Sequence, residues 1–506
     1  MAEQKQVAAP PPRPKYIQID REQGRFCSLM VDDLIAADHP ARMIWSMVAK
    51  LDLSMFESEV ASFERQAGRA AWSPQVLVSV LVYGYTLGTG SAREMERQME
   101  REPGLRWLLG MEKINHHTLS DFRRQDEEKL QGIFQQVLAV LASEDLVDFE
   151  TLLQDGTKMK AQASKQSMRR RQTLTEHLAA AKQCVAELDR QAAQEEAGKK
   201  PTKKEAARKR AAREKLERME AAMVELAAQE KDATPKQIEK IRVSETEPAA
   251  KRMKHPDGGF GPSYNLQLTT EGKNGFVVGW AVSTAPNDQH ELIPGLEKAT
   301  SCTGQRAKIM IADGGYGNRH NIEEMAQRQV ELVAPRMEAD KRQMGGLAAA
   351  GISVEFAGSQ FPPTADAQGL RCPMGQTLVH IGERKRHGHP VNRDQAAASD
   401  CGVCPRKPRC STKALARRID RVIESAAVQA HDQRMAEPAI KEKYKLRKQF
   451  AEYPFLRIKS NWRLTRFRLR GRLNAAKESL WMVLAFTMDR LQFVRRKQAM
   501  ALATAA

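Results

Sequence analysis

The chain has 506 residues, of which 28% are charged, and a formal net charge of +18 at pH 7. This length is enough for several domains with at least one large core, and the charge favours a polyanionic partner such as nucleic acid. No apolar run reaches the length of a membrane span and the N-terminus has no apolar secretory core, so we expect a cytoplasmic protein with no membrane partner.

The first part of the chain is expected to be helical after a disordered lead-in at residues 1–16, which are polar and rich in proline. Between residues 17 and 145, apolar residues recur at helical spacing behind residues that cap helices well. The predicted helix starts are Asp38, Ser73, Ser91 with Glu94 as a capping box, and Thr118 with Asp121, the last running on to Leu138.

Short helices and tight turns around His116–Thr118 fit a helix-turn-helix unit, which would make residues 17–145 a DNA-binding domain. A plain helical support domain fits the same pattern equally well.

Two apolar stretches that look like strands each end at an Asp-Gly pair. Val147–Leu153 leads to Asp155-Gly156, where we expect the strand to stop and a turn to begin. Lys308–Ala312 leads to Asp313-Gly314 in the same way. Two aspartates at strand ends can meet at one edge of a sheet, so Asp155 and Asp313 are candidates for a metal site.

Residues 163–247 separate the first of these strands from the rest. Apolar residues from Leu174 to Ala192 follow a coiled-coil spacing, which breaks at residues 198–202 and resumes from Leu216 to Leu226. This pattern predicts an antiparallel helical hairpin of coiled-coil type. Its many charges are more typical of a solvated face than of a DNA site.

The pattern after residue 247 predicts a mixed α/β core. Strands at 263–268 and 276–282 form a hairpin, and a helix at 290–299 leads to the strand before Asp313. A helix at 319–328 and a strand at 330–333 follow. With the hairpin insertion removed, residues 146–162 and 248–335 read as the first part of a ribonuclease H-like catalytic core, a mixed sheet with flanking helices.

A third acid is needed if the aspartates hold two metal ions for phosphoryl transfer. The best candidate is Glu452, which lies in a basic stretch between Arg447 and Lys459. Seven residues make two helical turns, so Glu452 and Lys459 share a face if Pro454 allows the helix to continue. The alternative interpretation is an ordinary basic amphipathic helix within residues 431–495, the expected last part of the core before a tail at 496–506.

Several motifs in this order resemble DDE-type insertion-sequence transposases, in the branch with a helical N-terminal domain, a charged insertion and a cysteine cluster. Arg447 and Glu452 are one residue further apart than in the commonest form of that signature. The matching segments are 81–85, 117–123, 155–158, 264–267 and 312–317, with Tyr444, Arg447, Glu452 and Lys459 as the C-terminal signature.

The resemblance implies that Asp155, Asp313 and Glu452 are catalytic and hold two Mg²⁺ or Mn²⁺ ions. It implies cleavage at transposon ends and transfer of the freed 3′-OH to target DNA, by a homodimer or larger assembly associated with the nucleoid. The residues expected to contact the double-stranded DNA are Tyr444, Arg447, Lys459, Lys158 and Arg123.

Residues 336–430 form a cysteine-rich insert. Cys401-x-x-Cys404 has the spacing of a zinc knuckle, and Cys372 and Cys410 would complete a four-thiolate site. We therefore predict a structural Zn²⁺ ion here, with free thiols or a redox pair as the alternative.

Two other functions fit parts of the pattern. A DNA-binding regulator or domesticated descendant would bind DNA without cutting it, but it would have no reason to keep the three acids. A ribonuclease H-like nuclease would cut without joining strands, and only a strand-transfer assay separates it from a transposase.

Overall fold

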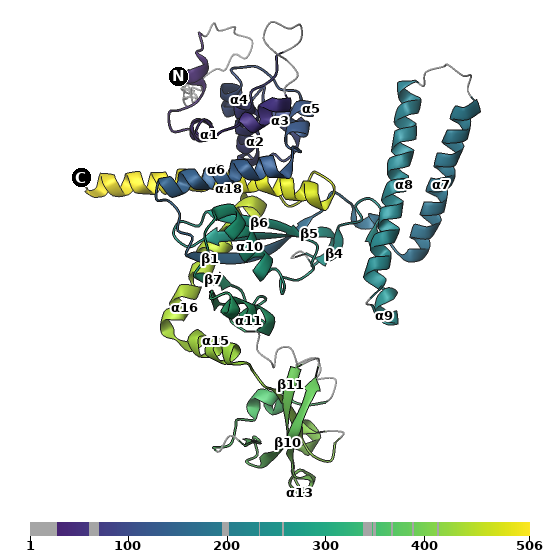
Figure 1. The fold of residues 1–506 in the computed structure, drawn as a ribbon, viewed down its shortest axis with the longest axis vertical. Coiled ribbons are helices and arrows are strands. Elements are labelled where there is room, and N and C mark those ends of the chain that lie inside the picture. Colours follow the sequence, from purple (N-terminus) through teal and green to yellow (C-terminus); the bar gives the residue numbers. More distant parts are fainter. Residues whose placement is uncertain are drawn as a thin grey trace, which may run out of the picture.

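The computed structural model describes residues 28–59, 70–194, 202–231, 233–255, 258–336, 347, 351–365, 368–386, 389–411 and 414–505. It is a mixed α/β structure with a helical N-terminal region, a central mixed sheet, a projecting helical hairpin and a small second sheet (Figure 1). The predicted lead-in at residues 1–16 lies outside the described residues.

In the described residues of the N-terminal region there are six α-helices and two 3₁₀ turns. They are η1 (Val31–Leu34), α1 (Pro40–Val48), η2 (Ser54–Glu59), α2 (Pro74–Thr86), α3 (Ala92–Gln98), α4 (Pro103–Leu108), α5 (His116–Phe122) and α6 (Glu127–Ser143). The most apolar of them, α2, is buried from Leu77 to Tyr85. A helix that is hydrophobic on all sides must be surrounded, and α2 is packed against α1, α4, α5 and the C-terminal helix at residues 472–505.

The helix caps differ in part from those predicted. Ser73 caps α2 as expected, its hydroxyl accepting from the Val76 amide. The start of α1 is capped by His39, not Asp38, and Ser91 makes no side-chain cap at α3. The helix predicted from Thr118 to Leu138 is two helices, because Asn115 caps α5 and the chain turns before α6.

The central sheet places one strand, β1 (Thr151–Lys160), between antiparallel and parallel partners. The strand order is β4-β5-β1-β7-β8. Strand β5 pairs with β4 through residues 260–263 and with β6 through residues 265–270. The remaining strands and helices of this part are β4 (Lys251–Lys254), β5 (Phe260–Glu271), β6 (Val277–Ser283), α10 (Leu292–Thr303), β7 (Ile309–Ala312), α11 (Arg319–Gln327) and β8 (Glu331–Val333). The predicted hairpin of β5 and β6 is confirmed.

The prediction that the first strand ends at Asp155 is wrong. Strand β1 does not stop there: its pairing with β5 continues through Asp155↔Leu268 and Gly156↔Gln267 to Lys160↔Ser263. Its pairing with β7 ends at Gln154↔Ala312. Asp155 therefore lies within a strand that still has one neighbour, just beyond the point where the other neighbour ends.

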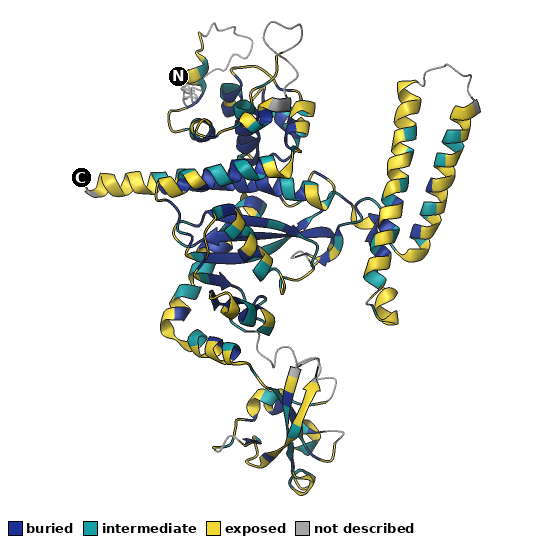
Figure 2. Ribbon diagram, viewed as in Figure 1, coloured by how far each residue is buried: buried dark blue, intermediate teal, exposed yellow. Residues whose placement is uncertain are grey.

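A long C-terminal helix, α18 (Arg472–Ala505), joins the N-terminal region to the sheet. It packs against α2, α6 and β6, and its residues from Leu480 to Leu491 are largely buried, whereas its end is exposed (Figure 2). At 1.5 Å per residue, its 34 residues span about 50 Å. Apolar residues of both regions thus belong to one continuous core.

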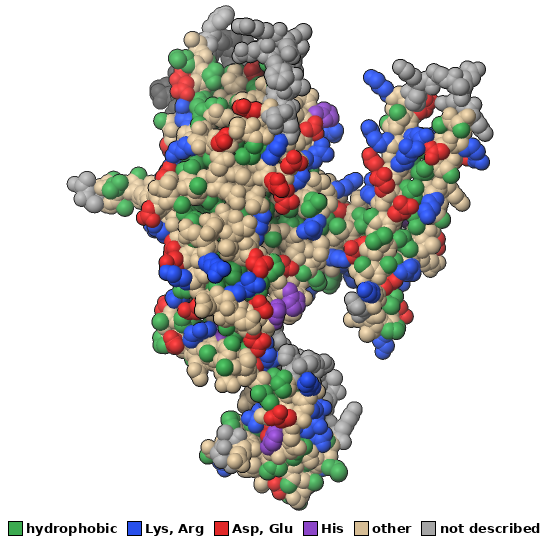
Figure 3. All heavy atoms as spheres, viewed as in Figure 1, with side chains coloured by type: hydrophobic (Ala, Val, Ile, Leu, Met, Phe, Trp, Pro, Cys, Tyr) green, Lys and Arg blue, Asp and Glu red, His purple; other side chains and the backbone are tan. Residues whose placement is uncertain are grey.

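The hairpin insertion consists of α7 (Arg171–Gln194) and α8 (Lys203–Glu230), which lie side by side (Figure 1). Its base holds the short strands β2 (Met168–Arg169) and β3 (Val243–Ser244), the turn η3 (Lys165–Ser167) and α9 (Pro235–Ile238). Acidic and basic side chains mix on its surface (Figure 3), and Asp189 of α7 pairs with Lys209 and Arg213 of α8. These charges therefore tie the two helices to each other. Most of the predicted break at 198–202 lies outside the described residues.

The cysteine-rich insert has a four-stranded antiparallel sheet, ordered β12-β11-β10-β9. Its small hydrophobic core includes the buried side chains of Phe356, Phe361, Leu370 and Leu378. Its elements are η4 (Val354–Phe356), η5 (Gly358–Gln360), β9 (Gly369–Arg371), β10 (Thr377–Arg386), β11 (His389–Ala396), α13 (Ala398–Gly402), α14 (Lys407–Cys410) and β12 (Arg418–Val422).

The chain returns to the sheet through short helical segments before α18. They are α15 (Ala426–Ala436), α16 (Pro438–Tyr444), η6 (Arg447–Ala451), α17 (Tyr453–Phe455) and η7 (Leu456–Asn461). None of the helices in the described part of the chain combines the length and the apolar character needed to cross a membrane.

The buried carboxyl of Glu478 on α18 predicts a pH-dependent stability. It accepts hydrogen bonds from the amides of Arg468 and Leu469, and burial raises its pKa from 4.5 to about 7. The folded state thus holds this proton more tightly than the unfolded state, so stability falls as pH rises from about 4.5 to about 7, by about 3 kcal/mol.

Glu478→Gln should remove that part of the pH dependence, because the amide stays neutral. Urea unfolding from about pH 5 to about pH 8 should show a smaller loss of stability in Glu478→Gln than in the wild type. Glu220→Gln, on the exposed face of α8, is the control and should keep the wild-type slope. Equal slopes for all three proteins would contradict an ionisation-linked role for Glu478.

Candidate catalytic site

Asp155 and Asp313 follow the last paired residues of two neighbouring parallel strands. Gln154 of β1 pairs with Ala312 of β7, so both aspartates lie at the same edge of that strand pair. Each carboxylate accepts a hydrogen bond from a nearby backbone amide. Asp155 accepts from the Gly156 amide at 2.8 Å, and Asp313 accepts from the Gly315 amide at 2.7 Å. The sheet thus brings together two acids that are far apart in the sequence.

The environment of Asp155 disfavours its charged form. Burial raises its pKa to about 7, and the nearby carboxylates of Asp313 and Glu452 raise it further, while the Gly156 amide and Arg447 act in the opposite direction. Asp313 and Glu452 are therefore close enough to Asp155 to act on its pKa, and such a group of carboxylates is typical of a centre that binds cations.

Glu452 reaches this centre from a helical segment with an unusual turn. Residues Arg447–Ala451 form a π-helical turn, in which the amide of Glu452 bonds the carbonyl of Arg447 five residues earlier at 3.3 Å. One extra residue in a helix is accommodated by such a turn. The longer spacing between Arg447 and Glu452 therefore leaves both side chains on one face.

Arg447 lies between two of the three acids. Its guanidinium is 2.5 Å from the Glu452 carboxylate and 3.5 Å from that of Asp155. Tyr444 is close by, since Arg447, Asp313 and Glu452 all influence its pKa, which burial raises. In the described residues no group of three or more His, Cys, Asp or Glu side chains is arranged to hold a metal ion. The guanidinium supplies the positive charge between the acids in this arrangement.

Lys459 ties the C-terminal segment to strand β1. It lies in a second π-helical turn, η7, and its ammonium donates to the Thr157 hydroxyl at 3.0 Å and to the Lys158 carbonyl at 3.3 Å. Lys459 therefore contacts β1 at the second and third residues after Asp155.

Two of the residues predicted to contact DNA are engaged elsewhere. Arg123 is only 6% exposed and donates to the Gly90 carbonyl at 2.7 Å inside the N-terminal region. The Lys158 ammonium is 3.1 Å from the carboxylate of Asp288, and its side chain is 16% exposed. Lys158 is thus neutralised by a protein acid in this structure.

Sequence reasoning missed Asp288 and the polar residues beside it. Asn265, Gln267 and Thr269 are buried and alternate along β5, so they face one side of the sheet. That alternation of polar residues in a buried strand is the signal that points to a polar network, because buried polar groups need partners.

Two comparisons with protein families bear on this site. Residues 29–125 match a transposase domain (DUF772), and residues 371–492 match a transposase DDE domain. Together the two matches support a DDE-type insertion-sequence transposase. The second match contains Tyr444, Arg447, Glu452 and Lys459, whereas Asp155 and Asp313 lie outside both. No curated protein and no solved structure matches the chain.

The four late cysteines lie around one hollow. Cys372, Cys401, Cys404 and Cys410 line it together with Phe361 and other residues of the insert. All four are free thiols, and burial raises the pKa of Cys410 to about 11, with the other three cysteines adding to the shift. The isolated Cys184 and Cys302 are also free, and Cys27 lies outside the described residues.

Gly156 is required by crowding and not by a turn. A Cβ atom there would lie 2.1 Å from the Gln267 amide nitrogen and 2.8 Å from an Asp288 oxygen. We expect Gly156→Ala to destabilise the protein by about 1–3 kcal/mol, measured by denaturant unfolding.

The matched control is Gly402→Ala in the insert, where a Cβ would meet no atom within 4 Å. This variant should unfold like the wild type. A Gly156→Ala protein as stable as the control would show that the network beside β1 can move aside freely.

Proposed function

We propose that the chain binds the ends of an insertion sequence and catalyses metal-dependent cleavage of those ends and their transfer to target DNA. The observation that carries the proposal is the meeting of Asp155, Asp313 and Glu452, from three distant segments, beside Arg447 and Lys459. The two family matches add independent support.

The catalytic core in this proposal is ribonuclease H-like. Its support is the sheet around β1, with the antiparallel pair β5 and β6 on one side and the parallel strands β7 and β8 on the other. Asp155 and Asp313 lie at the end of the parallel pair β1 and β7.

The donor set suits divalent cations of the Mg²⁺ type, which prefer carboxylate oxygens. Asp155, Asp313 and Glu452 would hold two such ions, which supply activation of the attacking oxygen and stabilisation of the leaving one. Arg447, now paired with two of these acids, would be released toward the DNA phosphates. Lys459 and Tyr444 would join it in binding the backbone near the cut.

The N-terminal region is the proposed site for recognising the transposon ends, since it carries the separate transposase-domain match. We propose that two or more copies act together on paired ends. The net charge of +18 favours such an extended contact with DNA.

Replacing any one acid should separate binding from chemistry. Asp155→Ala, Asp313→Ala and Glu452→Ala should each reduce cleavage by roughly three orders of magnitude while DNA-end binding persists, because each removes a metal ligand and not a main DNA contact. The assay uses labelled DNA from the flanks of the gene with Mg²⁺ and scores both nicks and strand transfer.

Glu442→Ala is the matched control, since Glu442 lies on the same segment but is exposed and pairs only with Lys445 among the contacts described. It should cleave like the wild type. Near wild-type cleavage by any of the three acid variants would refute the triad. Cleavage without joining would favour the nuclease alternative.

The cysteine hollow is the proposed site of one structural Zn²⁺ ion. Its support is the set of four thiols around a single space, which is the donor set of a closed zinc site. Cys372, Cys401, Cys404 and Cys410 would hold the ion as thiolates, so binding would release their protons.

Purified protein should then contain about one equivalent of zinc, and Cys401→Ser with Cys404→Ser should remove it. The small core of the insert would lose a cross-link, so limited proteolysis should cut this double variant faster between residues 351 and 422. Cys184→Ser, on the exposed face of α7, is the control. Zinc-free wild-type protein with a resistant insert would leave the four cysteines as free thiols.

A further inference from the structure

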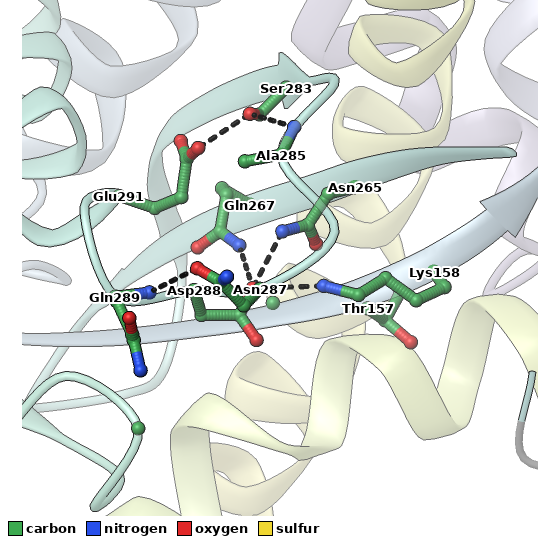
Figure 4. A network of polar contacts seen from close by, with 12 residues as sticks. Thr157, Lys158, Asn265, Gln267, Ser283, Ala285, Asn287, Asp288, Gln289 and Glu291 are labelled. Carbon is green, nitrogen blue, oxygen red and sulfur yellow. Dashed lines mark hydrogen bonds and ion pairs between the residues drawn. The ribbon is translucent and has the colours of Figure 1, made fainter. Parts of the chain in front are cut away.

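A single carboxylate oxygen of Asp288 accepts hydrogen bonds from three side chains. Asp288 lies in the loop between β6 and α10, and its Oδ1 accepts from Lys158 at 3.1 Å, Asn265 at 2.6 Å and Gln267 at 2.7 Å (Figure 4). Its side chain is 29% exposed, and none of these partners belongs to the catalytic acids. This concentration of donors on a loop residue needs an explanation beyond loop stability.

The donors come from the strands that carry the catalytic site. Lys158 is on β1, three residues after Asp155, and it pairs directly with Asn265 of β5. Gln267 pairs with Gly156, the residue next to Asp155. Since side chains alternate along a strand, the Asp288 network covers the face of β1 opposite that of Asp155.

Asp288 fixes which way the two amides point. A carboxylate only accepts hydrogen bonds, so both amide groups must turn their NH₂ toward it. For Asn265 this orientation leaves the buried Oδ1 without a partner in the described structure. A buried oxygen without a hydrogen-bond partner costs free energy. The hydrogen bond to Asp288 therefore determines the orientation of the Asn265 amide.

The orientation of Gln267 then connects the segments of two catalytic acids. With its NH₂ on Asp288, its Oε1 accepts from Gln154 at 2.8 Å and from the Tyr316 hydroxyl at 2.6 Å. Gln154 immediately precedes Asp155, and Tyr316 follows Asp313 by three residues. A reversed Gln267 amide would break the bond to Gln154, because two NH₂ groups would then face each other, and the Tyr316 hydroxyl would have to accept instead of donate.

We propose that Asp288 is a positioning residue of the catalytic site, which orients Gln267 so that the segments of Asp155 and Asp313 are held at a fixed separation. This inference rests on the proposed function in that the two acids are taken as metal ligands. Asp288 itself contacts neither metal nor DNA in this role, and its pairing with Lys158 is secondary.

The test is the affinity of the full-length protein for Mn²⁺, measured without DNA by the electron paramagnetic resonance signal of the free ion. Loss of a residue that orients metal ligands typically weakens metal binding about 10- to 100-fold. We expect a loss of that size in Asp288→Asn, which keeps the shape of the side chain but allows its own amide to donate. Tyr316→Phe should weaken Mn²⁺ binding in the same direction.

Glu291→Gln is the matched control. Glu291 belongs to the same loop and accepts a hydrogen bond from Ser283, but no described contact links it to Gln267 (Figure 4). It should bind Mn²⁺ like the wild type. Thermal melting of each variant checks that weaker binding does not reflect unfolding.

A double variant separates the two possible roles of Asp288. If Asp288 acts only as the counter-ion of Lys158, then Lys158→Met with Asp288→Asn should restore wild-type Mn²⁺ affinity, and our inference is overturned. If Asp288 acts through Gln267, the double variant should bind as weakly as Asp288→Asn alone.

Cleavage of end DNA provides the second readout. In Asp288→Asn the Mn²⁺ concentration for half-maximal cleavage should rise, with much of the rate recovered at saturating Mn²⁺. Wild-type Mn²⁺ affinity in this variant, or wild-type protein that binds no Mn²⁺, would overturn the inference. Wild-type protein that binds Mn²⁺ but leaves the DNA intact would contradict the proposed function alone, because the affinity comparison stands without cleavage.

Discussion

The arrangement of the site depends on one constraint, which is that a charged residue must sit in the middle of a buried strand. Strand β1 has neighbours on both sides up to Gln154 and on one side afterwards. Asp155 is the first residue of β1 beyond its pairing with β7. Its raised pKa measures the cost of that position, and every cationic or hydrogen-bonding group around it reduces the cost.

The same constraint explains why the site draws on so much of the chain. Arg447 and Glu452 come from the C-terminal segment, Asp313 from the neighbouring strand, and Lys459 binds the other end of β1. Helix α18 follows directly and shares its core with the N-terminal helices. The region with the first transposase match therefore shares a hydrophobic core with the part of the chain that carries the site.

The sequence was most informative where local signals agree with the fold. The hairpin of β5 and β6 was predictable because turn residues at 271–275 separate two apolar runs. Gly156 misled the prediction, since a glycine after Asp usually marks a turn, and here it is required by side chains that arrive from β5 and a distant loop. Asp288 has no local pattern, because its significance comes from partners 130, 23 and 21 residues away. The π-helical turn likewise cannot be read from composition.

That turn changes how the C-terminal signature should be recognised in other chains. A motif written with fixed spacing treats an extra residue between arginine and glutamate as a mismatch. In three dimensions the π-helical turn accommodates the extra residue, and the guanidinium and the carboxylate still meet at 2.5 Å. Insertions of one residue at this point are therefore structurally silent with respect to the pair. An evolutionary survey that allows either spacing would collect lineages which a rigid pattern divides into separate groups.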